Sequence, residues 1–288
     1  MIKRLFIFGF LILILAAALT GYGLFRRRQD ARLKRQNAKA PEEQITIIEG
    51  WTVKDIASYL EKKNLVKSAD FIEAAKNFNA EDYPLLASKP KTQNLEGFLF
   101  PDTYRISIAT SSGLPAISSR IIQKQLENFE NKFTPEMQAE AARQNLTLYQ
   151  AVILASIVEK ETGRNAQTAA EKQDLQQERQ TIAGIFYNRL KAGMPLQSDA
   201  TVNYITGKNS PQASLDDTKI DSPYNTYLYK GLPPGPICNP SLSSLKAALE
   251  PIASSYYYFL HRPDTGQAIY SQTFEQHLQS KQKYLDNK

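Results

Sequence analysis

The sequence predicts an α+β protein in which an N-terminal transmembrane helix precedes a small α/β module and a larger mixed α+β domain. Three observations support this class. An uncharged run of 21 residues lies near the N-terminus, several segments carry apolar residues at helical spacing, and a pattern near the C-terminus is typical of a β-hairpin. With 288 residues, of which 42% are hydrophobic, the chain can bury a substantial core and is expected to form more than one domain.

The membrane segment is predicted over Leu5–Phe25, which is long enough to cross a bilayer once. A cleaved signal peptide is the alternative, because Ala16–Ala18 resembles a processing site, but the apolar run continues past it into an arginine cluster. That cluster, within Arg26–Arg35, would hold the following chain in the cytoplasm, whereas Lys3 and Arg4 favour the reverse orientation. Charge alone therefore leaves the topology open.

Folded structure is predicted to follow a polar linker over residues 26–44. It begins with a short strand and turn over Ile45–Gly50, and then a helix that Thr52 caps together with Asp55. The inward residues of this helix are predicted to be Val53, Ile56, Ala57 and Leu60. A second helix follows Ser68, and its apolar face is predicted to consist of Phe71, Ile72, Ala75 and Phe78. One strand and two helices are too small a unit to be stable without a neighbour.

The middle of the chain is predicted to be mainly helical. Leu95–Ile106 comes first, as an extended aromatic segment that is broken at Pro101. Helices are then predicted over Ser118–Phe133, 147–163 and Thr181–Leu190. Between the last two, the Gln- and Glu-rich stretch 165–180 is expected to be exposed. Residues 196–202 lead, as a strand or loop, into a short helix capped by Ser198 or Asp199.

The C-terminal part is rich in loops and ends in a hairpin and a helix. Asn239 and Pro240 predict the N-cap and first position of a helix that runs to Leu249. The hairpin and the last helix are predicted from Tyr256–His261, Gln267–Ser271 and the capping pair Thr273 and Gln276.

Charge and residue usage exclude several functions. The net charge of +6 arises in the first 35 residues, which hold eight basic residues and one acidic residue. The remaining chain has 27 basic and 28 acidic residues, so its charge gives no reason to expect nucleic-acid binding. Cys238 is the single cysteine, which excludes an intramolecular disulfide and a cysteine-based zinc site. His261 and His277 lie in no ligand spacing, so we expect both to be structural and the protein to use no metal or cofactor.

The candidate catalytic residue is Glu161, at the end of the helix over 147–163. Thr147 and Gln150 form a capping-box pattern at the start of this helix, and Gly163 is a natural terminator. An apolar stripe of Leu154, Ile157 and Val158 continues, at the next helical position, into Glu161. A carboxyl on a buried face is desolvated, so its pKa should rise and it could carry a proton near neutral pH. Glu159 lies about 200° around the helix, and the alternative is that both acids are solvated or paired.

Four loop segments gather polar and aromatic side chains, over 96–104, 197–201, 222–227 and 231–239. A cleft lined by Tyr, Asn, Gln and Thr with one protonatable carboxyl suits carbohydrate, because rings stack on sugar faces and amides pair with hydroxyls. The alternative is that these loops only cap a core.

Five successive motifs in these regions carry a family resemblance. They are Leu95-Glu-Gly-Phe-Leu-Phe-Pro-Asp-Thr-Tyr104, Leu154-Ala-Ser-Ile-Val-Glu-Lys-Glu-Thr162, Phe186-Tyr-Asn-Arg-Leu190 with Met194-Pro-Leu-Gln-Ser-Asp-Ala-Thr-Val202, Tyr224-Asn-Thr-Tyr227, and Gly231-Leu-Pro-Pro-Gly-Pro236. In this order the motifs resemble the YceG-like endolytic murein transglycosylases, and the resemblance covers about residues 45–285. It implies a catalytic domain over 91–288 behind a shortened LysM-like module over 45–90, with 5–25 as the anchor and 1–4 as a cytoplasmic tail.

The resemblance implies cleavage of the MurNAc–GlcNAc β-1,4 bond in nascent glycan strands, with 1,6-anhydro-MurNAc ends as product and strand elongation terminated. The family's catalytic acid falls on Glu161, in agreement with the helical-face argument. The residues expected to contact sugar are Gln197, Ser198, Asp199, Tyr224, Asn225, Thr226 and Tyr227. A water-using muramidase, the first alternative, would need a second carboxylate, for which Asp199, Asp102 and Glu96 are the candidates.

The second alternative is a membrane-anchored, glycan-binding scaffold without catalysis. For the enzyme, the resemblance implies peptidoglycan glycan strands and peptidoglycan synthases as partners. It implies the inner (plasma) membrane of a bacterial cell as the location. We expect the catalytic domain to face the periplasm or cell exterior, because the substrate exists only there, although the arginine cluster after the span opposes this topology.

Overall fold

The computed structural model describes Arg26 and residues 42–285 apart from 80, 82, 109–112, 163–165, 209 and 211. The chain divides into two compact units, of which one holds residues 1–42 and 107–109 and the other holds 43–106 and 110–288. The elements below belong to the second unit, apart from the ends of two strands. The predicted membrane segment over 5–25 lies outside the described residues, and no helix within the described part is long and apolar enough to cross a bilayer.

The first strand, β1, spans Glu42–Thr46 and pairs with β2, Thr103–Ser107. The strand and turn were predicted over Ile45–Gly50. Strand β1 therefore begins three residues before the predicted start and ends four residues before Gly50. The correction has a physical reason, because main-chain pairing with β2 decides where the strand begins and ends, while Ile45 and Ile47 are buried.

Two helices complete the N-terminal module. Helix α2 spans Val53–Lys62, with the predicted capping box between Thr52 and Asp55 and with all four predicted inward residues buried. Helix α3 spans Ser68–Lys76 and buries Phe71 and Ala75. The other two residues of its predicted face, Ile72 and Phe78, remain partly exposed, and Phe78 packs instead on the Tyr83 ring, 5.6 Å away between centroids.

The segment before β2 is not extended as predicted. Residues 95–98 form a turn in which Gly97 has a φ of +89°, and the extended conformation begins only at Thr103. Helix α4, Gly113–Lys132, begins earlier than expected, and a further helix, α5, Pro135–Arg143, was not predicted. Its signal was present in the sequence, because Thr134 is its N-cap and Pro135 its first residue. A short 3₁₀ turn, η1, spans Pro84–Leu86.

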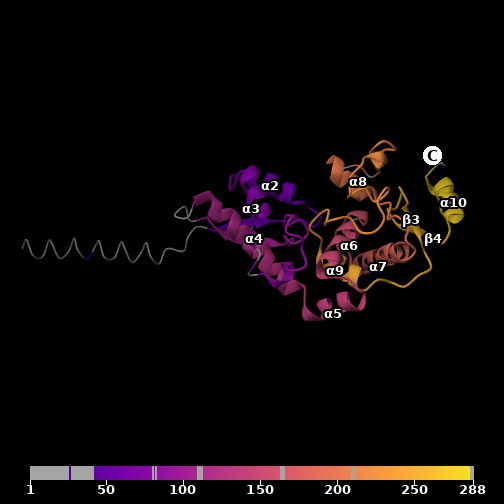
Figure 1. Ribbon diagram of the computed structural model, residues 1–288, viewed down its shortest axis with the longest axis horizontal. Coiled ribbons are helices and arrows are strands. Elements are labelled where there is room, and N and C mark those ends of the chain that lie inside the picture. Colours follow the sequence, from indigo (N-terminus) through magenta and orange to yellow (C-terminus); the bar gives the residue numbers. More distant parts are fainter. Residues whose placement is uncertain are drawn as a thin grey trace, which may run out of the picture. The chain divides into compact units, whose positions relative to one another are not determined.

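Three helices form the centre of this unit. Helix α6, Leu148–Glu161, packs against α9, Leu242–Leu249, and against α7, Ala169–Lys191, while α9 also packs on α7 (Figure 1). The Gln- and Glu-rich stretch forms most of the first half of α7 and is largely exposed as expected, although it buries Leu175 and Glu178. A capping box of Thr168 and Glu171 begins this helix, and the predicted inward residues Ile182, Ile185 and Phe186 are buried.

The remaining elements carry the loops of the candidate site. Helix α8 spans Asp199–Thr206, and the 3₁₀ turn η3 spans Asp217–Lys219. Strands β3, Tyr258–His261, and β4, Ala268–Ser271, form the predicted antiparallel hairpin, and α10 follows over Phe274–Tyr284 with the predicted cap. The N-cap of α9 is Ser241 and not Asn239.

Asn239 has a different role from the predicted cap. Its Oδ1 accepts hydrogen bonds from the main-chain N–H of Gly97 and of Leu99, both at 2.9 Å, and its Nδ2 donates to the Trp51 carbonyl at 2.9 Å. Because every polar atom of this amide is taken by distant main chain, Asn239 joins the N-terminal module to the central helices and is not free to cap α9.

Candidate active site

Helix α6 carries the candidate acid, and it is buried on all sides rather than along one stripe. Every residue from Ala151 to Val158 is buried, which includes the predicted stripe of Leu154, Ile157 and Val158. A helix that is apolar all round lies inside a protein. The predicted capping box of Thr147 and Gln150 is present at its start. The helix ends at Glu161 with Thr162 as C-cap, and Gly163 lies outside the described residues.

The two glutamates at the end of α6 have different surroundings. Glu159 Oε2 accepts hydrogen bonds from the Ser241 N–H at 2.9 Å and the Ser241 hydroxyl at 2.5 Å, at the start of α9. A carboxylate at this position compensates the partial positive charge of a helix N-terminus. Glu159 therefore connects two helices, whereas Glu161 points elsewhere and is partly exposed.

Glu161 has the properties expected of a proton donor. Burial of the carboxyl raises its pKa, and the charge of Asp199 raises it further. A hydrogen bond from the Ser198 hydroxyl to Oε1, at 2.5 Å, and the charges of His261 and Arg189 act in the opposite direction. Burial is the largest effect, so the direction that was predicted from the apolar face is confirmed.

Ser198 reaches Glu161 because it does not cap its own helix. It is the N-cap of α8, yet its side chain makes no capping hydrogen bond. The hydroxyl donates to Glu161 instead, and the residue is only 2% exposed. This confirms Ser198 as the cap position and shows that its hydroxyl serves the carboxyl of another element.

Arg189 is a residue of this site that the motif reasoning quoted but did not single out. It is buried on α7, and its guanidinium donates to the carbonyls of Tyr257 at 2.6 Å and Leu196 at 2.7 Å. It also lies over the Tyr258 ring, 5.2 Å from the centroid. Arg189 thereby holds the chain just before Ser198 against the β3 segment, and its charge lowers the pKa of Glu161. Its place in the motif Phe186–Leu190 was the signal that could have identified it.

Four of the predicted sugar contacts are accessible, namely Gln197, Asp199, Tyr224 and Tyr227. Gln197 is exposed and has a φ of +51°, an uncommon conformation for a residue other than glycine. Tyr227 is partly exposed and donates its hydroxyl to Asp199 Oδ1 at 2.7 Å. Tyr224 is partly exposed as well, and its ring lies 5.1 Å from that of Tyr204. Burial, the charge of Asp199 and the charge of Glu161 together raise the pKa of Tyr227, so this ring lies near the protonatable carboxyl, and a partly exposed ring in that place suits sugar binding.

Asn225 and Thr226 are placed differently from their prediction as sugar contacts. They are 0% and 1% exposed, and Asn225 Nδ2 donates to the carbonyls of Thr218 at 3.0 Å and Ile220 at 2.8 Å. Thr226 accepts a hydrogen bond from the Gln197 N–H at its carbonyl, at 3.0 Å. Both therefore hold the loop over 222–227 in place instead of facing solvent.

The three candidate partners for Glu161 in a hydrolytic mechanism are not equivalent. Asp199 is the one whose charge acts on Glu161. Glu96 is buried and accepts from the Val53 N–H at 3.0 Å at the start of α2, and Asp102 accepts from the Thr103 N–H at 2.7 Å and from Asn128 at 3.0 Å. Glu96 and Asp102 thus have structural partners of their own.

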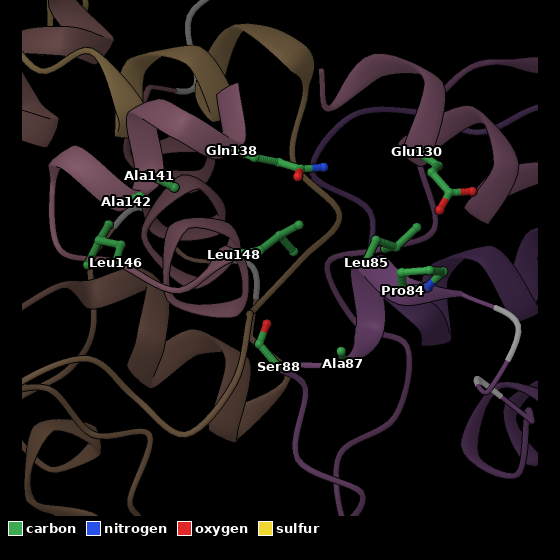
Figure 2. A pocket seen from close by; sticks show the side chains of 10 residues that line it. All are labelled: Pro84, Leu85, Ala87, Ser88, Glu130, Gln138, Ala141, Ala142, Leu146 and Leu148. Atoms are coloured by element: carbon green, nitrogen blue, oxygen red, sulfur yellow. The ribbon is translucent and has the colours of Figure 1, made fainter. Parts of the chain in front are cut away.

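The cavity found in the structure does not contain Glu161. Within the part of the chain that the structure describes, no group of three His, Cys, Asp or Glu residues could hold a metal ion. A cavity of about 320 Å³ lies instead between η1 and the α5–α6 corner, where Leu85 and Pro84 face Leu146 and Leu148 (Figure 2). It contains none of the predicted site residues, so it does not belong to the candidate active site.

The fold described above holds one partly buried, protonatable carboxyl among tyrosines, amides and hydroxyls. This combination of fold and site defines the class of protein. The YceG-like family matches residues 26–283, and the chain belongs to this family. A crystal structure of a YceG-like protein from Listeria monocytogenes has the same fold, with a TM-score of 0.69 and 31% identity. It is similar over 88% of this chain and 80% of that one.

Two curated relatives carry the name endolytic murein transglycosylase. The Bacillus subtilis (strain 168) protein is 35% identical over 255 residues, which cover 85% of this chain and 66% of the relative. The Streptococcus pneumoniae (serotype 2, strain D39) protein is 32% identical over 269 residues, which cover 85% of this chain and 45% of the relative. The chain thus corresponds to only part of the length of these relatives.

Proposed function

We propose that the protein is an endolytic lytic transglycosylase that cleaves the β-1,4 bond between MurNAc and GlcNAc in peptidoglycan and leaves a 1,6-anhydro-MurNAc end. The observation that carries the proposal is Glu161, whose carboxyl has a raised pKa and accepts a hydrogen bond from the Ser198 hydroxyl at the end of a buried helix. Two relatives that are named for this activity support the choice of substrate.

One carboxyl is sufficient for the complete reaction. Protonated Glu161 donates its proton to the glycosidic oxygen while the bond between this oxygen and C1 of MurNAc breaks, and the bonding electrons stay with the departing GlcNAc O4. The resulting carboxylate then takes the proton of the MurNAc 6-hydroxyl as O6 forms a bond to C1. No water is consumed, and Glu161 returns to its protonated form.

Accessible side chains beside Glu161 are suited to hold the glycan during these steps. Tyr227 offers a partly exposed ring, and Gln197 offers an exposed amide next to Ser198, while Tyr224 in the same loop as Tyr227 offers a second partly exposed ring. The Tyr227 hydroxyl donates a hydrogen bond to the Asp199 carboxylate, so this carboxylate is directed toward the Tyr227 side chain. A hydrolase would require a second carboxylate about 5–5.5 or 6.5–9.5 Å from the first, so Asp199 is the residue that a hydrolytic result would implicate.

We infer the roles of the membrane segment, the N-terminal module and the catalytic domain from the sequence. Residues 5–25 form a single membrane anchor, residues 45–90 a shortened LysM-like module, and the catalytic domain over 91–288 acts outside the cytoplasm, where synthases make the strands. A reporter fused after Lys288 tests the location, since activity of a cytoplasm-only reporter would contradict it.

The proposed reaction is tested by mass spectrometry of purified glycan strands after digestion with the full chain in mild detergent. Wild type is expected to yield fragments that end in 1,6-anhydro-MurNAc, and Glu161→Gln is expected to yield none, because an amide cannot donate the required proton.

The alternatives give different products. Fragments with reducing ends would identify a hydrolase and direct attention to Asp199. Glycan binding without cleavage by the folded wild-type protein would instead identify a scaffold, and either result would reject the proposed reaction.

A further inference from the structure

Three hydrogen bonds enclose the main chain of Ser198. Its N–H donates to Thr226 Oγ1 at 3.0 Å, its carbonyl accepts from Thr201 Oγ1 at 2.8 Å, and the two threonine hydroxyl oxygens lie 2.9 Å apart. Thr201 and Thr226 are 0% and 1% exposed, so water does not compete for these bonds. The three residues therefore form a closed ring.

The proton positions in this ring follow from the number of donors. A threonine hydroxyl has one hydrogen, and Thr201 uses its hydrogen on the Ser198 carbonyl. In the contact between the threonines, Thr226 must then be the donor, and it accepts from the Ser198 N–H at the same time. Every member has its donor and acceptor engaged, and a fully satisfied buried network of this kind is rigid.

We propose that Thr201 and Thr226 are positioning residues of the acid, which hold Ser198 so that its hydroxyl occupies Glu161 Oε1 and leaves Oε2 as the oxygen that carries the catalytic proton. Neither threonine touches the carboxyl in this arrangement. They act through the Ser198 hydroxyl, whose one hydrogen is directed at Oε1 at 2.5 Å. An oxygen that accepts this bond is disfavoured as the site of the acidic proton, so the proton resides on Oε2.

The two threonines are not expected to be equally important. Among the described residues, Thr226 Oγ1 is the acceptor recorded for the Ser198 N–H. The Ser198 carbonyl keeps a second partner, the Thr201 N–H at 3.2 Å, when the Thr201 hydroxyl is removed. Loss of the Thr226 hydroxyl should therefore disturb Ser198 more, while the bond from Gln197 N–H to the Thr226 carbonyl keeps the loop in place.

The positioning role of the threonines should change the pH dependence of kcat/KM. This expectation rests on the proposed function of Glu161 as acid. Titratable groups face Glu161 from four segments, namely Asp199 of α8, Arg189 of α7, His261 of β3 and Tyr227 of the loop over 222–227, and all four are retained in the variants. The Ser198 bond stabilises the carboxylate and lowers its pKa, so misdirection of this hydroxyl raises the pKa. Because the protonated form is active, the alkaline decline of kcat/KM then moves to higher pH.

The test compares Ser198→Ala, Thr226→Val, Thr201→Val and Thr226→Ser on purified glycan strands, with Thr181→Val as matched control. Thr181 also donates its hydroxyl to a main-chain carbonyl, but within α7. We expect Ser198→Ala and Thr226→Val to lose about tenfold in kcat and to move the alkaline decline upward. Thr201→Val should show a smaller change in the same direction, and Thr226→Ser and Thr181→Val should resemble wild type.

A second measurement does not depend on activity. In protein labelled with ¹³C at the glutamate side-chain carboxyl, the Glu161 resonance, assigned by its loss in Glu161→Gln, should titrate at higher pH in Thr226→Val. An unmoved titration in Thr226→Val while Ser198→Ala shifts it would overturn the positioning role, as would equal behaviour of Thr226→Ser and Thr226→Val. Persistent cleavage by Glu161→Gln would instead overturn the proposed function.

Discussion

At the scale of single residues, two glutamates separated by one position have opposite roles. Glu159 is bound by the N–H and hydroxyl of Ser241 at the start of α9, so its charge stabilises the fold. Glu161 accepts a hydrogen bond from the Ser198 hydroxyl, but burial raises its pKa, so its ionised form is disfavoured. A residue that the fold disfavours in its charged form is suited to hold a proton.

This contrast predicts that Glu159→Gln lowers stability while most activity remains, whereas Glu161→Gln removes activity without lowering stability. Glu159→Gln should lower the free energy of unfolding by about 1 kcal/mol, because it removes a charge from a helix N-terminus, while most cleavage activity remains. Glu161→Gln should abolish cleavage and leave Tm equal to wild type or higher, because a buried ionisable group is removed. Thermal denaturation and glycan cleavage, measured on the same samples, check both. Equal loss of activity in the two variants would contradict the assignment.

At the scale of elements, the turn over 95–98 lets α6 and the loop before α9 approach each other closely. Gly97 has a φ of +89°, and a Cβ atom there would lie 2.6 Å from Pro236 Cγ and 2.7 Å from Val152 Cγ1. Its N–H also donates to Asn239. The glycine is therefore required for two reasons, namely its backbone conformation and the absence of a side chain.

These two reasons can be separated by a matched pair of variants. Gly207 has a φ of +70° but no atom within 4 Å of an added Cβ, so Gly207→Ala reports the backbone strain alone. We expect Gly207→Ala to cost about 1 kcal/mol and Gly97→Ala about 3 kcal/mol, because the second adds steric overlap in a packed region. Chemical denaturation measures both. Similar losses would show that the neighbours of Gly97 move aside without cost.

At the scale of the whole molecule, Glu96 connects the N-terminal module with the central helices. It is 5% exposed and accepts from the Val53 N–H at the start of α2 and from Asn239 Nδ2 at 3.2 Å. Burial raises the pKa of Glu96 to about 8, against an ordinary value of 4.5. A proton is therefore bound in the folded protein over a range where the unfolded chain has lost it.

This difference predicts that stability falls with rising pH. The contribution of Glu96 is fully present below its ordinary pKa of 4.5 and is lost as the pH rises through about 8, because only the folded state binds the proton between these values. Tm of the wild type should therefore decrease between pH 5 and pH 9, and it should decrease less in Glu96→Gln. Since Glu161 also has a raised pKa, the difference between the two proteins is the quantity to compare. Parallel curves would contradict a protonated Glu96.

The sequence by itself determined several helix caps and the hairpin, and it placed Glu161 on a buried helical face. Thr52, Thr147 and Thr273 were predicted correctly as caps because each bonds a residue only three positions away, so no other part of the chain is needed. The apolar spacing before Glu161 indicated its burial for the same reason, since a helix places neighbouring turns on one face. These features depend on local geometry alone.

Only the tertiary structure decided which side chains serve Glu161. Asn239 was expected to cap the next helix, yet it is bound to the turn over 95–98, and Ser198 leaves its own helix uncapped to reach Glu161, 37 positions earlier in the chain. The guanidinium of Arg189 and the hydroxyl of Thr226 likewise act on segments from other elements. Such choices depend on which donors and acceptors meet inside the packed protein, where a buried polar group must find a partner, and no sequence spacing encodes that meeting.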